Sequence, residues 1–251
     1  TYSGVANGSG VYSVTGIVAS AGQVVSVFLD TNGGNQANLI TRASGTGNLS
    51  GLNLYQNRVI VRHEDAGPIT NANLDQYDNG GDSDMMFTVV TNIAVYEDGA
   101  KLIVWTGDTH TPGGITTTSP SNDGTDSVVD GDILIQSGAT LSMGANVLSV
   151  GGDFMNSGTF SYSAGSHGTH FQATATGHAI EDGTNNFDYV SFNGVGGGWS
   201  FSSAVTLSGD LTMNGGTLSG TQNITVNNGY VNGDGTINLT GGTFLLDGTG
   251  N

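Results

Sequence analysis

Short alternations of apolar and polar residues, separated by turn-forming residues, run along the whole chain. In the first part they predict strands over residues 10–18, 23–30, 37–44, 52–63, 85–91, 92–98 and 101–107. About seven strands in about 100 residues, divided by GG, NG and DG turn signals, are typical of an immunoglobulin-like β-sandwich. No stretch of a dozen residues has the spacing of an amphipathic helix. The pattern predicts an all-β protein with an immunoglobulin-like β-sandwich over residues 1–110.

The pattern changes in the second half, where apolar residues recur every 13 positions, as at Leu211, Ile224 and Ile237. Within each unit the apolar positions fall six and seven residues apart, which is the length of one short strand and one tight turn. A flattened solenoid with one such unit per circuit fits this spacing, and so does a three-sided β-helix with about 20 residues per circuit. We favour the three-sided helix, because its interior has room for columns of Phe and Leu. The sequence thus predicts a parallel β-helix, or β-solenoid, over 131–251, joined to the sandwich by a linker over 111–130.

The end of the repeat raises the question of what covers it. A repeat of this kind buries the apolar side chains of each unit against the next unit. The last unit is followed only by the residues GTGN, with no differently built cap. We therefore expect Val231, Ile237, Phe244 and Leu246 to form a self-assembly surface. A second copy would cover it, with a strand from its N-terminal stretch TYSGVANGSGVYSV or with the edge of its sandwich.

Charge limits the partners of the chain. Its 21 acidic and 4 basic residues give a formal net charge of −17, and residues 102–251 contain no Lys or Arg. This balance argues against binding to nucleic acid and against attraction to an anionic membrane, and it leaves divalent cations as plausible partners. No apolar run of the sequence is long enough to cross a bilayer, so we expect no membrane span. The chain has no Cys and opens on Thr1 rather than Met. We interpret the chain as a processed, secreted product.

The sequence segments that contain the repeat resemble those of a known family. GDLTMNGGTL, GATLSMGANVLSVGGDFMNSGTF and GTINLTGGTF resemble the Gly-, Thr- and Asn-rich repeats of bacterial secreted β-helix proteins of the filamentous-haemagglutinin and autotransporter adhesin type. The resemblance covers residues 131–160 and 205–247. It implies a large, exported, surface-associated protein whose β-helix serves as a stalk or fibre. The N-terminal half departs from this pattern.

A calcium site is one candidate for chemistry. The loop DQYDNGGDSD places Asp75, Asp78, Asp82 and Asp84 within ten residues. Hard oxygen ligands concentrated in this way suit Ca²⁺, although the order of an EF-hand is not present. The alternative is a solvated acidic turn.

Two further metal or catalytic patterns are weaker. The stretch 167–182 supplies three histidines and two carboxylates, which suit zinc or nickel only if its strands fold back; otherwise the histidines face solvent. Polysaccharide hydrolysis requires a pair of carboxylates. Candidates for that pair are Asp153, Asp210, Asp234 and Asp247, but each sits in a glycine-bearing turn where Asp is expected for turn chemistry alone.

These observations favour a non-catalytic, extracellular structural protein that polymerises head to tail into a surface filament. One alternative is a fragment of a cell-surface adhesin or a carbohydrate-binding module, with glycans or other cells as partners. Its aromatic candidates for stacking on sugars are Tyr55, Tyr96, Trp105 and Trp199, which also suit a core or a cross-strand pair. A polysaccharide-degrading β-helix enzyme is the remaining alternative.

Overall fold

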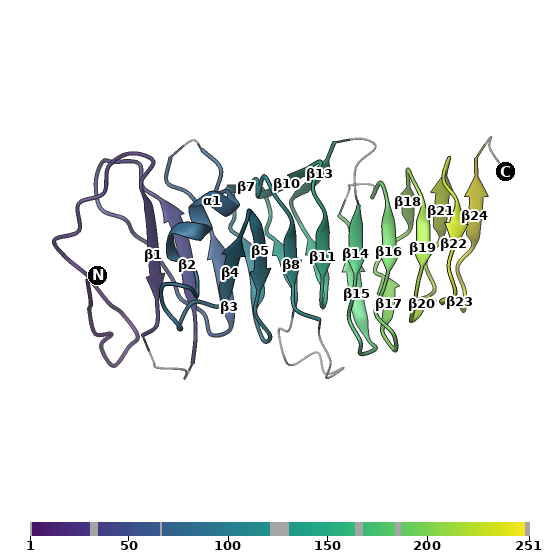
Figure 1. The fold of residues 1–251 in the computed structure, drawn as a ribbon, viewed down its shortest axis with the longest axis horizontal. Helices are drawn as coiled ribbons and strands as arrows, with labels where there is room; N and C mark the ends of the chain where they lie inside the picture. Colours follow the sequence, from purple (N-terminus) through teal and green to yellow (C-terminus); the bar gives the residue numbers. More distant parts are fainter. Residues whose placement is uncertain are drawn as a thin grey trace.

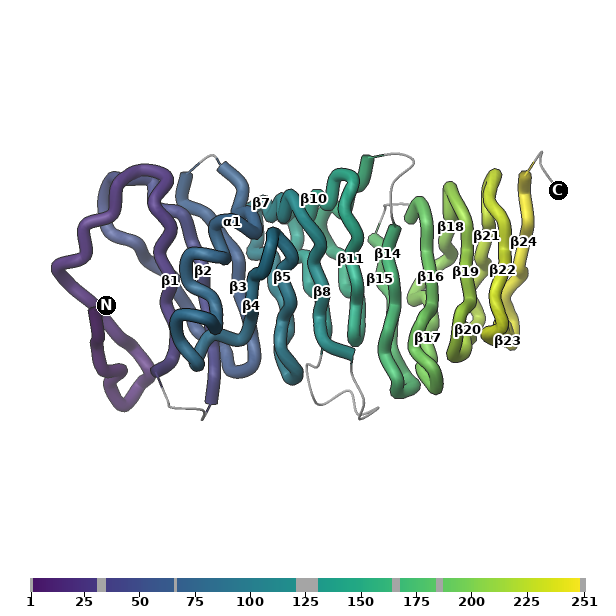
Figure 2. Tube along the Cα trace, viewed as in Figure 1, coloured from purple at the N-terminus to yellow at the C-terminus, as the bar shows by residue number. Residues whose placement is uncertain are grey.

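The computed structural model describes residues 2–30, 35–65, 67–120, 131–163, 168–183 and 187–248. Across these ranges the chain is an all-β parallel solenoid of about nine rungs, where a rung is one complete circuit of three faces. The rungs stack along the long axis, with residues 2–23 at one end and the last rung at the other (Figures 1 and 2). The predicted β-solenoid is therefore confirmed.

One face, here called sheet 1, runs nearly the whole length of the molecule. Its described strands lie in the order β1-β2-β3-β6-β9-β12-β15-β17-β20-β23. Their bounds are β1 Val24–Phe28, β2 Asn38–Arg42, β3 Arg58–Val61, β6 Lys101–Val104, β9 Ile133–Ile135, β12 Phe154–Asn156, β15 His178–Glu181, β17 Gly198–Phe201, β20 Thr217–Gly220 and β23 Thr236–Leu239. From β2 onward every pairing in sheet 1 is parallel.

The second face, sheet 2, has the order β22-β19-β16-β14-β11-β8-β5-β4. Its strands are β4 Phe87–Val90, β5 Ile93–Tyr96, β8 Thr116–Thr118, β11 Leu148–Val150, β14 Thr169–Phe171, β16 Val190–Phe192, β19 Leu211–Met213 and β22 Val231–Asn232. In the described ranges the third face consists of two three-stranded sheets, with a bridge between Phe187 and Leu207 on the same side. They contain β7 Thr109–His110, β10 Thr140–Gly144, β13 Thr159–Tyr162, β18 Val205–Leu207, β21 Ile224–Asn227 and β24 Phe244–Asp247.

The strand registers explain the period seen in the sequence. Where the rungs carry no insertion, partners in successive rungs are about 20 residues apart, as in the pairs Leu218–Ile237 and Ile133–Phe154. One 13-residue repeat unit of the sequence therefore contains two strands, and these two strands lie in two of the three faces. Accordingly, Leu211 lies in sheet 2, Ile224 in the third face and Ile237 in sheet 1. Three units make two rungs, and the predicted circuit of about 20 residues is correct.

The immunoglobulin-like sandwich predicted for residues 1–110 is not confirmed. Such a sandwich has two antiparallel sheets, whereas β2, β3 and β6 pair in parallel and continue directly into β9. The solenoid thus already includes residues of the first half. The strand β7 ends where the linker predicted over 111–130 begins, and β8 lies inside that predicted linker. Antiparallel pairing occurs between β1 and β2 and between β4 and β5. A short helix α1 (Asn71–Leu74) and a 3₁₀ turn η1 (Asp75–Tyr77) precede β4.

The core is one continuous column inside the three faces. In the interior rungs the central residue of a three-residue strand points outward, and its two neighbours point inward and are buried, as in β16, β18 and β19. Aromatic rings fill the middle of the column, where Phe154, Phe160, Phe171 and Phe187 contact one another. Burial of this apolar surface is the main stabilising contribution available to a chain without Cys.

His110 in β7 gives the core a pH dependence. Its side chain is fully buried, and Nδ1–H donates to the carbonyl oxygen of Ile69 at 2.9 Å. Burial lowers the pKa of His110 from 6.5 to about 4. Because this folded-state pKa lies below the unfolded value, the unfolded chain binds the proton more readily, and stability falls as the pH drops from 6.5 toward 4.

We expect the wild type to lose about 2 kcal/mol more stability between pH 7 and pH 5 than the variant His110→Leu. The Ile69 carbonyl keeps a partner in this variant, because Thr111 N–H also donates to it at 2.8 Å. Urea denaturation of both proteins at the two pH values measures the difference. If the free energy of unfolding changed equally with pH in both proteins, His110 would not be buried in its neutral form.

Candidate functional site

The last described rung differs from all interior rungs in the exposure of its apolar side chains. Val231, Ile237 and Phe244 are only partly buried, although their register partners one rung earlier, Leu211, Leu218 and Ile224, are buried. Leu246 is 45% exposed, whereas its partner Val226 is 1% exposed. The four residues predicted for self-assembly therefore lie on one surface, here called the end surface, which continues the core columns of the solenoid.

The backbone of this rung is also half paired. The strands β22, β23 and β24 each stand at the margin of their sheet, with a described neighbour on one side only. Each margin presents a row of N–H and C=O groups that a further parallel strand would pair. The end surface thus has the apolar side chains and the hydrogen-bonding groups that an additional rung requires.

The opposite end is built differently. There sheet 1 ends in β1 and sheet 2 ends in β4, and both strands run antiparallel to their neighbours. Residues 2–19, which lie beyond β1 in Figure 1, contain no strand and expose several apolar side chains. Val5 is 94% exposed, Val18 88% and Val11 65%. Both ends of the described solenoid therefore expose apolar surface.

The acidic loop does not gather its aspartates into one ligand set. Asp78 accepts backbone N–H groups from Gly80 at 3.0 Å and from Val89 at 2.9 Å. Asp82 accepts the N–H of Asp84 at 3.0 Å, Asp84 is buried, and Asp75 is exposed in η1. Among the described residues no group of three or more His, Asp or Glu is arranged to hold a metal ion. Calcium binding stays a prediction from the sequence.

The histidine-rich stretch is divided between two faces. His170 lies on β14 in sheet 2, and His178 lies on β15 in sheet 1 together with Glu181. His167 lies outside the described residues. The strands thus carry His170 and His178 apart, and within the described part of the stretch a zinc or nickel site is not formed.

Two of the turn aspartates considered for hydrolysis cap the next rung. Asp153 Oδ1 accepts the backbone N–H of Ala179 at 2.9 Å, and Asp210 Oδ1 accepts that of Tyr230 at 2.8 Å. In each case the donor occupies the equivalent position one rung further along the chain. These side chains satisfy an N–H close to the start of a strand, inside β15 for Ala179 and just before β22 for Tyr230. This is a structural reason for Asp at this position in the repeat.

We expect Asp210→Ala to lower the free energy of unfolding by about 1 kcal/mol, because the N–H of Tyr230 loses a charged acceptor. The exposed Asp234 provides the control, and Asp234→Ala should change stability by less than about 0.5 kcal/mol. Urea denaturation followed by circular dichroism gives both values. Equal losses in the two variants would contradict the proposed role of Asp210.

The aromatic residues considered for sugar binding fall into two groups. Tyr96 and Trp199 are fully buried in the core. Tyr55 and Trp105 stack on each other with ring centroids 6.4 Å apart, over a small apolar cluster on the outer side of sheet 1. Tyr55 is 43% exposed, so this pair is the part of the predicted set that a glycan could reach.

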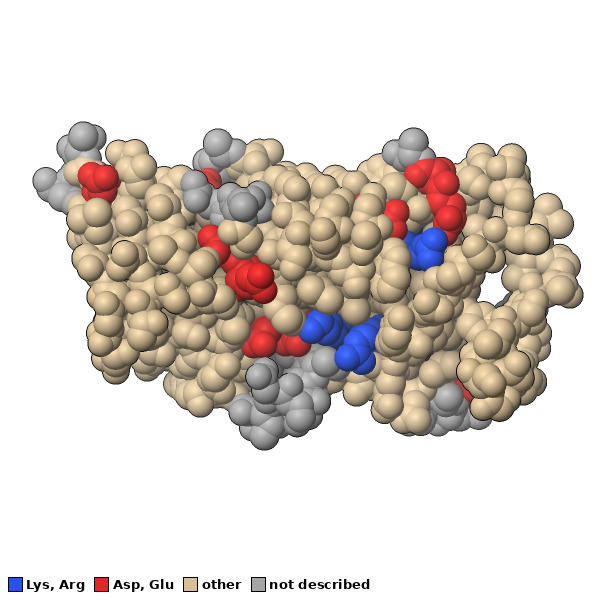
Figure 3. All heavy atoms as spheres, turned by 180° about the vertical axis from the view of Figure 1, so that it is seen from behind, with Lys and Arg blue, Asp and Glu red and all other residues tan. Residues whose placement is uncertain are grey.

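Sequence reasoning missed a row of charged residues on the outer side of sheet 1. The row consists of the first residues of β3 and β6 and the residues just before β9 and β12, which the strand registers place at equivalent positions: Arg58, Lys101, Asp132 and Asp153. Figure 3 shows basic and acidic side chains side by side over the middle of this face, while the C-terminal end at the left is mostly uncharged. The sequence does contain one signal of this row. Asp132 and Asp153 are separated by the length of one rung, so they are expected at equivalent positions in neighbouring rungs.

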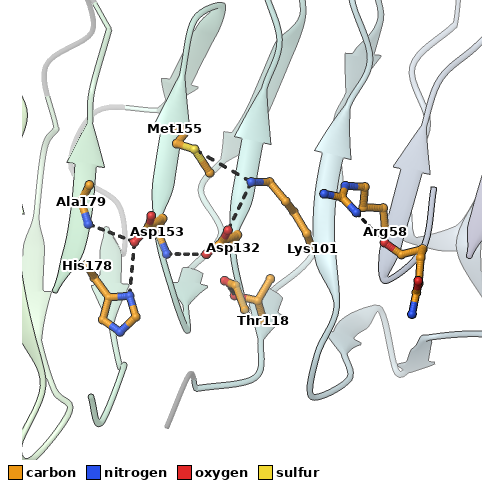
Figure 4. Close-up of polar contacts among 10 residues, drawn as sticks. Arg58, Lys101, Thr118, Asp132, Asp153, Met155, His178 and Ala179 are labelled. Carbon is orange, nitrogen blue, oxygen red and sulfur yellow. Dashed lines mark hydrogen bonds and ion pairs between the residues drawn. The ribbon is translucent and has the colours of Figure 1, made fainter. Parts of the chain in front are cut away.

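Contacts join Lys101, Asp132 and Asp153 of this row, as Figure 4 shows. Lys101 Nζ lies 3.2 Å from Asp132 Oδ2, and the backbone N–H of Asp153 donates to Asp132 Oδ1 at 2.8 Å. Asp153 Oδ1 in turn lies 3.2 Å from Nδ1 of His178. Burial raises the pKa of the Asp132 carboxyl, and the charge of Lys101 acts in the opposite direction.

Helices of the described ranges are too short and polar to cross a membrane.

Comparison of the chain with protein-family models, with curated proteins and with solved structures gives no match.

Proposed function

We propose that this chain is a non-catalytic structural protein of the cell exterior, and that its solenoids stack head to tail into a filament. The observation that carries the proposal is the end surface, where Val231, Ile237, Phe244 and Leu246 continue the core columns but are half exposed. Covering them with another β-layer would bury apolar area and pair the margins of β22, β23 and β24.

The occupant that we propose is a second copy of this chain. Its N-terminal end offers residues 2–19, which are rich in β-branched residues, lie outside the sheets and expose Val5, Val11 and Val18. An extended segment of this kind is suited to strand addition. Because the two contacting surfaces are different, each added subunit leaves a free end surface, and the contact generates a filament rather than a closed pair.

Sedimentation velocity of the purified chain over a range of concentrations tests the proposal. We expect a series of species that grows with concentration, because each subunit binds the next through the same contact. A single monomeric species at all concentrations would contradict self-assembly. If such monomers bound a glycan array, the alternative of an adhesin or carbohydrate-binding module would replace the filament.

A further inference from the structure

Lys101 is the only lysine of the chain, and its side chain lies in an unusual setting. It extends from the first residue of β6 along the outer side of sheet 1 toward the next rung, where it meets Asp132 (Figure 4). The side chains of Lys101 and Asp132 are only 11% and 12% exposed. Met155 Sδ, 3.9 Å from Nζ, adds an apolar neighbour. The pair is therefore largely withdrawn from water.

The backbone holds these two residues in fixed register. Leu102 pairs with Ile133 across β6 and β9, which places Lys101 opposite Asp132. The N–H of Leu102 donates to the carbonyl oxygen of Asp132 at 2.9 Å, so the two chain segments are joined next to the side-chain contact. Groups held together in this way react as parts of one molecule, with a large gain in effective concentration.

The two oxygens of the Asp132 carboxyl are held differently. Oδ2 lies 3.2 Å from Lys101 Nζ, while Oδ1 accepts the backbone N–H of Asp153 at 2.8 Å. A backbone donor in this position would stabilise negative charge on Oδ1 if a nucleophile attacked Cγ. The geometry thus provides a nucleophile, an electrophilic carbon and a donor for the developing oxyanion.

We propose that Lys101 and Asp132 form an intramolecular isopeptide bond that ties two successive rungs of the solenoid together covalently. First a proton passes from the Lys101 ammonium to the Asp132 carboxylate. The neutral amine then attacks Cγ, the bond from Cγ to Nζ forms, and the bond from Cγ to Oδ2 breaks. Oδ2 leaves as water with the transferred proton and one more proton from the nitrogen, and Oδ1 becomes the amide oxygen. One ammonium and one carboxylate thus give one amide and one water, with no oxidant or co-reactant.

The environment favours the uncharged carboxyl that this reaction needs. Desolvation raises the pKa of the Asp132 carboxyl more than the Lys101 charge lowers it. A partly buried carboxyl of this kind takes up a proton more readily than an exposed one. The product is a neutral amide, which is easier to bury than two separate charges.

The cross-link would strengthen the solenoid independently of the filament proposed above. Pulling a solenoid along its axis separates successive rungs, and a covalent bond between β6 and β9 would stop that separation at one point. It would also close the loop from residue 101 to residue 132, which restricts the unfolded chain.

Mass spectrometry of the intact, denatured 1–251 chain tests this inference. We expect the wild type to be lighter than its sequence by one water molecule. The variant Lys101→Arg keeps the positive charge but lacks the amine nucleophile, and we expect it to have its full sequence mass. A β-type circular dichroism spectrum shows that each protein is folded before the measurement.

Peptide mapping separates the cross-link from other losses of water. Digestion of the wild type with pepsin should give a branched peptide that joins the segments holding Lys101 and Asp132. Succinimide formation at an Asp-Gly sequence, such as Asp98-Gly99, also removes water, but it gives linear peptides and persists in Lys101→Arg. A folded wild type with its full sequence mass would overturn the inference. A loss of water shared by both proteins, with linear peptides only, would overturn it equally.

Discussion

The variant Phe154→Ala is expected to lose about 3–5 kcal/mol of unfolding free energy, the range observed when a large buried aromatic residue is truncated. Phe154 on β12 is fully buried at the centre of the core column. Its ring centroid lies 4.9 Å from that of Phe160, 5.6 Å from that of Phe187 and 6.5 Å from that of Phe171. Alanine would remove all three ring contacts and leave a cavity between rungs.

The size of this effect depends on how far the neighbouring rungs can close the cavity. The backbone ladders hold β12 between β9 and β15, so we expect little collapse. Urea denaturation of the wild type and the variant gives the difference. The control Tyr230→Ala removes an aromatic ring that is 62% exposed, and it should cost less than about 0.5 kcal/mol. A loss below about 1 kcal/mol for Phe154→Ala would be inconsistent with close packing of these rings.

The double variant Phe244→Asp, Leu246→Asp is expected to abolish assembly and to leave the β-type spectrum of the subunit unchanged. Both side chains point toward the core columns, opposite Ile224 and Val226 on β21. In a head-to-tail contact the two new carboxylates would be buried without partners, and each such charge costs several kcal/mol. In the free subunit they remain partly hydrated, because this rung is not covered by described residues.

A matched control at and just before the same strand separates the effect of position from that of charge. Leu245 and Thr243 alternate with Phe244 and Leu246 and are exposed on the outer side. The variant Thr243→Asp, Leu245→Asp adds the same two negative charges but places them away from the end surface. Sedimentation velocity should show assembly for this control and monomers for the first variant. If both double variants assembled like the wild type, the end surface would not be the contact.

The predictable part of the fold was the repeat itself. The spacing of Leu211, Ile224 and Ile237 predicted short strands, and side-chain size favoured a three-sided circuit over a flattened one. These features follow from the sequence because the last rungs carry no insertions, so each face returns at nearly constant intervals. The half-exposed apolar residues of the last rung follow from the same periodicity.

The N-terminal half was harder to predict for two physical reasons. An alternation of apolar and polar residues shows that a strand has one buried face, but it does not show whether its neighbour is parallel or antiparallel. Insertions also hide the periodicity there. Val61 pairs with Val104, about twice as far along the chain as one plain rung would place it, because α1, η1, β4 and β5 lie between them. The sequence therefore resembled a sandwich where the chain continues the solenoid.

The charged pair was missed because its members are far apart in the sequence. A long stretch of chain separates Lys101 from Asp132, and only the register of β6 and β9 places them side by side. By contrast, Asp153 and Asp210 were noticed as isolated turn residues. Their role became clear only when the structure showed which N–H of the next rung each one accepts.

Electron microscopy of the chain at high concentration tests head-to-tail stacking most directly. About nine rungs, spaced by about 4.8 Å, predict filaments whose axial repeat is at least about 43 Å, with the strands perpendicular to the filament axis. Dispersed single subunits, or fibres in which the solenoids lie side by side with their end surfaces free, would contradict the account.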